Sequence, residues 1–89
     1  MTTNEAVKHL DAARASAEAA IRAVENLLVP HDYQDVAALT IRAAEALLAA
    51  AAQFLTEGDE AAFDSISRSE DLLDAVYETI TGDMDADED

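Results

Sequence analysis

Residues 36–56 read VAALTIRAAEALLAAAAQFLT, and Arg42 and Glu45 are the two charged residues of this stretch. Its apolar side chains recur at helical spacing on more than one side of the helix that they predict. A helix that is apolar on more than one side is buried against more than one neighbour. The stretch therefore predicts a central helix, expected over about 33–56, or a helix that carries an oligomer interface.

The length and low charge of this stretch also raise the question of a membrane span. A charged side chain at the centre of a bilayer costs roughly 2.5–3.5 kcal/mol, and the stretch carries two such side chains and Gln53. A buried helix of a soluble bundle is the better interpretation. The first ten residues, MTTNEAVKHL, lack the apolar segment of a signal peptide. We therefore expect no membrane partner and a cytoplasmic location.

A first helix is expected before the central one, over about 3–29. Thr2 and Glu5 have the spacing of a capping box, and Pro30 cannot continue a helix. Its apolar seam repeats at about 3.5 residues. One charged residue interrupts this seam, whose members are Val7, Leu10, Arg14, Ala17, Ile21, Val24 and Leu28.

A third helix is expected after the central one, over about 60–81, with Asp59 as its cap and Gly82 as its end. Asp32 is expected to cap the central helix, and Gly58 suits the left-handed position that closes it. The inner stripe of the third helix also contains one charge, because its members are Phe63, Ile66, Glu70, Leu73, Tyr77 and Ile80.

Short links between helices make consecutive helices antiparallel neighbours. The sequence therefore predicts an all-α protein, an antiparallel three-helix bundle in one domain of residues 1–82. Residues 83–89, DMDADED, carry almost no apolar side chain and are expected to form a disordered acidic tail. An oligomer built from helical hairpins is the alternative.

Arg14 and Glu70 are the charges that interrupt the two apolar seams, and each lies seven residues after an apolar member. In a bundle whose first and third helices run in the same direction, both fall near the middle. We expect a buried ion pair between them, or a partner for each on the central helix, either Glu45 or Arg42. A structural role in helix register is favoured over catalysis.

The net charge of −15 is unevenly distributed along the chain. Residues 1–56 carry a net charge of −3, whereas residues 57–89 carry −12. Such a field disfavours phosphate and hence direct binding of nucleic acid, and it favours a partner protein with a basic surface. Adaptation to high salt would spread the charge over the whole surface, so we treat it as an alternative.

The third helix carries acids at a spacing of three, four or seven residues, which places them on one outward line. We name this the acidic line, and its members are Glu60, Asp64, Asp71, Asp74 and Glu78. The sequence predicts that the line docks on a basic groove, including one that binds nucleic acid, as an inhibitor or regulator resembling the phosphate line of DNA would. The alternative is a structural module that forms a homo-oligomer through residues 33–56.

Signals for catalysis or cofactor binding are weak. There is no Cys and no Gly-rich phosphate loop, and the serines lack a His and an acid at a suggestive spacing. His9 and His31 each lie four residues from an acid, but no further zinc ligand is evident. We therefore expect a protein that is not an enzyme and that needs no metal or cofactor.

Overall fold

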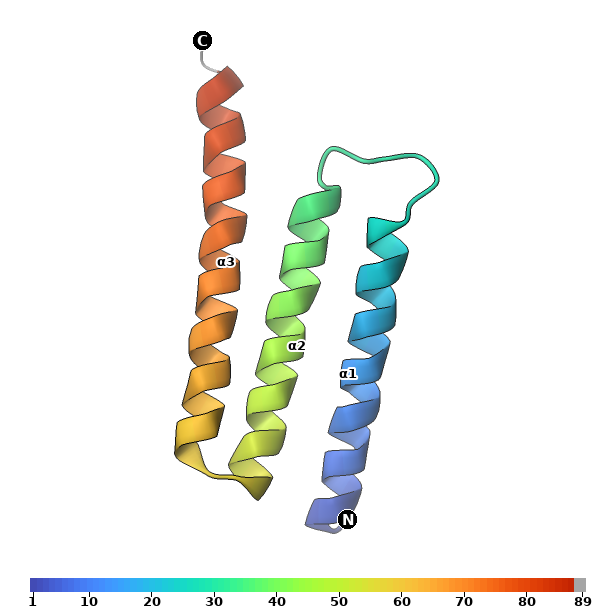
Figure 1. Ribbon diagram of the computed structural model, residues 1–89, viewed down its shortest axis with the longest axis vertical. Helices are drawn as coiled ribbons and strands as arrows, with labels where there is room; N and C mark the ends of the chain where they lie inside the picture. The colour runs from blue at the N-terminus through green and yellow to red at the C-terminus, as the bar shows by residue number, and fades with distance from the viewer. Residues whose placement is uncertain (88–89) are drawn as a thin grey trace.

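The computed structural model describes the backbone of residues 1–87 and the side chains of residues 1–82. Three helices follow one another, α1 (Thr3–Glu25), α2 (Gln34–Thr56) and α3 (Asp59–Asp87), and the described residues contain no strand. Consecutive helices run in opposite directions (Figure 1). The expected all-α fold of three antiparallel helices is thus confirmed.

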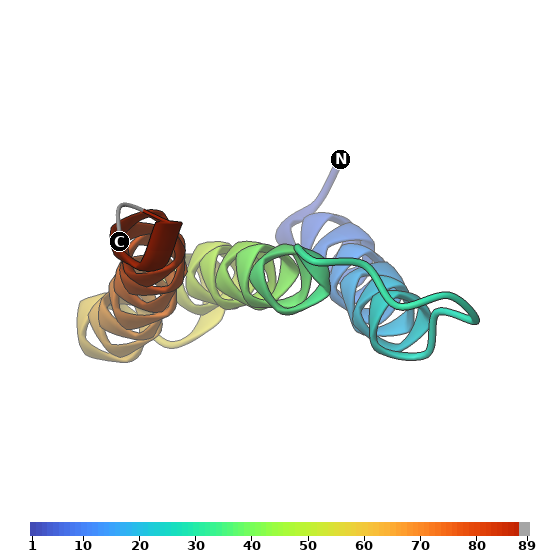
Figure 2. The ribbon, with the colours of Figure 1, turned by 90° about the horizontal axis from the view of Figure 1, so that it is seen from above.

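The three helices lie side by side in one open layer, with α2 in the middle. In the described part of the chain α2 contacts both neighbours, whereas α1 and α3 do not contact each other (Figure 2). The layer measures 55 × 30 × 15 Å, so its smallest dimension is close to the diameter of one helix with its side chains. Each of α1 and α3 is therefore held by α2 alone.

The sequence of α2 explains this central place. Ala43, Ala46 and Ala50 are buried on the side that carries Gln53 and faces α3, and Ala38 and Ala52 are buried toward α1. Small side chains on both flanks let two other helices approach closely. α2 is also the helix whose length and composition would allow a membrane crossing, with 28% of its most apolar window buried in the layer, a test that core helices of soluble proteins also pass.

The buried core consists of small side chains. Beside Ile21, the buried apolar residues are all alanines, and Ser69 is the buried polar residue in the described part of the chain. Stabilisation by burial scales with the apolar area removed from water, so alanines contribute little each. Half-buried aliphatic side chains such as Leu10, Leu48 and Leu72 add further apolar burial.

The face that α3 turns toward α2 differs from the predicted stripe. Ala62 and Ser69 are buried there, whereas Phe63, Leu73 and Tyr77 of the predicted stripe are exposed. The predicted stripe is therefore turned partly away from α2, while its members Ile66 and Ile80 stay half-buried. The alanine surface of α2 favours small residues opposite it, because these let the two helices approach closely.

The link between α1 and α2 begins earlier than Pro30 would require. Asn26 caps α1, and both its backbone N–H and its side-chain Nδ2 donate to the carbonyl of Arg22, at 3.1 and 2.7 Å. The predicted helix end at residue 29 was therefore wrong. Leu28, which we expected in the apolar seam, is fully exposed.

The N-terminal caps follow the prediction in α1 and depart from it in α2. Thr2 Oγ1 accepts the backbone N–H of Glu5, at 3.2 Å, which is one of the two hydrogen bonds of a capping box. α2 instead begins after Tyr33, and Asp32 makes no cap. The backbone N–H of Tyr33 donates to His31 Nδ1, and Gln34 Nε2 donates to the carbonyl of Glu25. The side chains of His31 and Gln34 therefore hold this corner in place of Asp32.

The two glycines have different roles. Gly58 has a φ of +105° and donates its N–H to the carbonyl of Gln53, as expected for the end of α2. Gly82 was expected to end α3, but the helix continues through it to Asp87. Glycine inside a helix costs about 1 kcal/mol relative to Ala, which does not forbid continuation. Of the predicted disordered tail, 83–89, the backbone follows α3 as far as Asp87, and residues 88–89 lie outside the described part of the chain.

The glycines offer a matched test of this difference. Gly58→Ala is expected to lower the free energy of unfolding by about 1–2 kcal/mol, because an L side chain is strained at this φ. Gly82→Ala is expected to raise it by up to about 1 kcal/mol, since a Cβ there would meet no atom within 4 Å. Chemical denaturation measures both values. Equal effects of the two changes would contradict the different backbone conformations assigned to Gly58 and Gly82.

Candidate partner-binding surfaces

The acidic line forms the outer edge of α3. All five of its residues are exposed, and in the described part of the chain none of them takes part in an ion pair. Asp71 lies two residues after the buried Ser69, which places it roughly 160° around the helix, on the side away from α2. The line extends over about 27 Å at 1.5 Å per residue. The structure therefore brings the five predicted carboxylates together on one free edge.

The structure does not bring Arg14 and Glu70 together. Glu70 is exposed on α3, a helix that does not contact α1, whereas Arg14 is half-buried on α1. The Nε atom of Arg14 is buried without a hydrogen-bond partner within the described residues. The expectation of a buried ion pair is corrected, because it assumed a closed bundle in which α1 and α3 meet.

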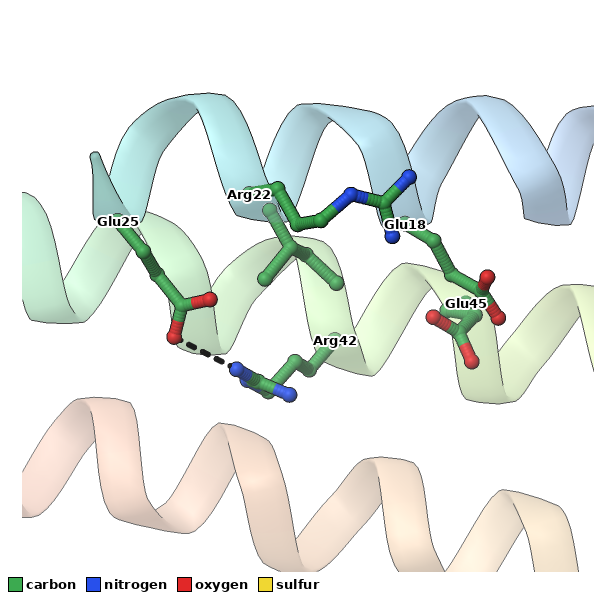
Figure 3. A pocket seen from close by; sticks show the side chains of 6 residues that line it. Glu18, Arg22, Glu25, Arg42 and Glu45 are labelled. Atoms are coloured by element: carbon green, nitrogen blue, oxygen red, sulfur yellow. Dashed lines mark hydrogen bonds and ion pairs between the residues drawn. The ribbon is translucent and has the colours of Figure 1, made fainter. Parts of the chain in front are cut away.

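A shallow hollow of about 290 Å³ lies between α1 and α2. Arg42 donates to Glu25 there, with 2.8 Å between Nη2 and Oε2, and both side chains are more than 40% exposed (Figure 3). Exposed ion pairs contribute roughly 0–1 kcal/mol. The hollow has polar and charged walls, since its lining residues are Glu18, Ile21, Arg22, Glu25, Arg42 and Glu45.

The charged lining of this hollow mixes acidic and basic side chains. The structure shows no group of three metal-ligating side chains among the residues that it describes. Arg42, which the sequence suggested as a possible partner of Glu70, is engaged by Glu25 instead. Sequence reasoning missed Glu25 as its partner, although the antiparallel pairing of the first two helices brings the end of one beside the start of the other.

Large apolar side chains gather on one face of the layer. We name this the apolar face, and its exposed members are Leu47, Phe54, Leu55, Phe63, Leu73 and Tyr77. Phe54 of α2 and Phe63 of α3 meet edge to face, with 5.9 Å between ring centroids, and join the two helices of this face. Sequence reasoning missed the face on α3, because it placed those side chains in the core.

The two faces of the layer differ in chemistry. Leu47 lies five residues after Arg42, which is about 140° around α2. The ion pair of Arg42 with Glu25 and the hydrogen bond of Ser65 with Gln53 therefore lie on the face opposite to the apolar one. Glu70 is the one charge between Phe63 and Tyr77 on the apolar flank of α3.

These features define a class: a small, acidic, all-helical protein with one charged edge and one apolar face. Comparison of the chain with family models, with characterised proteins and with solved structures finds no match. Its function must therefore be argued from the two surfaces themselves.

Proposed function

We propose that this chain is a non-enzymatic protein-binding module that docks the acidic line on a basic surface of a partner protein. The observation that supports the proposal is the free edge of α3, where five exposed carboxylates of one sign lie on a straight helix. A rigid helix fixes the spacing of these charges before binding. Binding of a partner with complementary charges therefore costs little conformational entropy in the acidic line, because the line is already ordered.

The charge of the line predicts how it would bind. Complementary charges accelerate association and disfavour partners of the same sign, and salt screens both effects beyond about 8–10 Å. A groove that binds nucleic acid presents the required basic surface. In its finer form, the proposal is that the chain occupies such a groove as an inhibitor or regulator and is displaced by DNA.

The test compares two variants with the same change in net charge. The line variant carries Asp64→Lys, Asp71→Lys and Glu78→Lys, and the control variant carries Asp11→Lys, Glu18→Lys and Glu57→Lys, three exposed positions outside the line. Each protein is immobilised to retain basic proteins from a cell extract at low salt, and the retained partner is then purified for affinity measurement.

We expect the line variant to bind the purified partner at least about 100-fold more weakly, since close charge pairs across an interface contribute substantially to binding. The control variant should stay within about threefold, because changes of exposed charges away from an interface mainly affect long-range steering. Equal binding by the line variant, or no basic protein retained by the wild type, would contradict the proposal. A partner that binds duplex DNA and this chain at once would contradict the finer form.

A further inference from the structure

The apolar face carries an inference that goes beyond the proposed docking of the acidic line and does not depend on it. Its six large side chains are each between 37% and 68% exposed, while the layer buries mostly alanine. Six large apolar side chains that stay exposed leave part of the available hydrophobic stabilisation unused. Covering this face would complete the core.

The surface area indicates how large the cover is. A compact monomer of 9.5 kDa would expose about 5,000 Å² by the general scaling of surface with mass, whereas this chain exposes 6260 Å². The surplus of about 1,200 Å² is summed over the whole chain, including the link and the end of α3, and is of the same order as the roughly 800 Å² that each partner contributes to a standard protein interface. The open layer therefore has enough surface for a stable dimer.

We propose that a second copy of this chain covers the apolar face, so that two layers pack face to face into a six-helix assembly. A second copy is a partner that is always present with the first, and it offers the same exposed apolar side chains in return. Leu47 lies close to the middle of α2 and would pack near the two-fold axis. Obligate homodimers commonly lack a stable folded monomer.

Charge selects the direction of the two-fold axis. An axis parallel to the helices places α3 of one copy over α1 of the other, and it separates the two acidic lines to opposite edges. An axis across the helices would place α3 over α3 and bring both acidic lines to the same edge, where like charges repel. α1 carries four acids against Lys8, Arg14 and Arg22, a net charge of −1, so it repels α3 less than a second α3 would. The parallel axis is therefore favoured.

The other occupant to consider is a membrane, because α2 has the length and composition of a membrane-spanning helix. The net charge of −15 opposes approach to an anionic lipid surface. Glu70 also lies within the apolar flank of α3, where a lipid interior would leave its carboxylate without a partner. The position of Glu70 favours a protein cover, which can offer its carboxylate a partner, over lipid.

The oligomeric state tests the inference first. Light scattering coupled to size exclusion should give twice the 9.5 kDa mass of one chain. Leu47→Asp should raise the dimer dissociation constant at least about 100-fold, as the loss of a central apolar contact does. Leu47→Ala is a milder change that keeps the helix, and it should raise the constant about tenfold. Leu28→Asp, at a fully exposed position of the link, should leave the mass unchanged.

Disulfide formation tests the direction of the axis, since the chain has no cysteine of its own. Ala51 is exposed and lies one turn from both Leu47 and Leu55 on α2. With the axis parallel to the helices, Ala51→Cys meets its own copy and should form a covalent dimer. With the axis across the helices, the two copies of α2 run antiparallel and cross at their middle. The two copies of position 51 would then lie about 18 Å apart, beyond the roughly 7 Å that a disulfide spans between Cα atoms.

The outcomes separate the proposals. Ala23→Cys, on the outward face of α1, is the control and should remain reduced much longer than Ala51→Cys. A wild-type chain that stays folded and monomeric at every concentration overturns the dimer, and Ala51→Cys that oxidises no faster than the control overturns the parallel axis. Wild-type protein that floats with phosphatidylcholine vesicles in place of dimerising assigns the face to a membrane and overturns the proposal.

Discussion

Replacing Ala62 with Leu is expected to lower the free energy of unfolding by about 3 kcal/mol, at the upper end of the usual cost of overpacking. Ala62 is fully buried on α3, and the buried residues of α2 are all alanines, which cannot move aside as long side chains can. The larger residue must push the two helices apart. Small domains have a free energy of unfolding of only about 5–15 kcal/mol, so the loss is a large part of the whole.

Ala23→Leu is the matched control for this overpacking, because Ala23 is exposed on the outward side of α1. It should change the free energy of unfolding by less than about 0.5 kcal/mol. Both variants are measured by chemical denaturation at one protein concentration, since the stability of an associating protein depends on it. A loss below about 1 kcal/mol for Ala62→Leu would mean that α2 and α3 are not in close contact at this position.

Ile21→Ala is expected to have an effect of similar size. It should lower the free energy of unfolding by about 3 kcal/mol, within the usual range for truncating a large buried aliphatic side chain to Ala. Ile21 is the one large apolar side chain that is buried in the described part of the chain. It attaches α1 to α2, and α1 has no contact with α3 to hold it otherwise. The loss should therefore be concentrated in one helix.

Amide hydrogen exchange shows where this loss occurs. Amides of α1 should exchange much faster in Ile21→Ala than in the wild type, while those of α2 and α3 keep most of their protection, because local opening follows local contacts. Leu28→Ala, at a fully exposed residue, is the control and should leave all three helices unchanged. Equal acceleration in all three helices would show that the layer opens only as one unit.

The helices and their ends could largely be predicted from local sequence. The capping spacing of Thr2 and Glu5 and the positive φ of Gly58 are properties of a few neighbouring residues, and both were confirmed. The predicted helix ends that were wrong depended on which of several nearby polar groups bonds to the backbone at the helix terminus. Asn26 ends α1 before Pro30 is reached, and His31 and Gln34 hold the start of α2 in place of Asp32.

The acidic line could also be predicted, because its geometry is that of a single helix. Residues three, four and seven apart share one side of any α-helix, whatever packs on the other side. Their exposure followed from the cost of burying unpaired carboxylates. The five residues accordingly lie together on the outer edge of α3.

Tertiary structure alone decided which side of each helix is buried and which helices meet. α3 offers two neighbouring lines to α2, one of small residues through Ala62 and Ser69 and one of large residues through Phe63 and Tyr77. Periodicity shows that both lines exist, but the choice depends on the alanine surface of α2, which is distant in sequence. The same choice opens the layer, separates Arg14 from Glu70 and exposes the apolar face. Helical periodicity is a local property of the chain, whereas packing depends on the fit between surfaces that the chain brings together only when it folds.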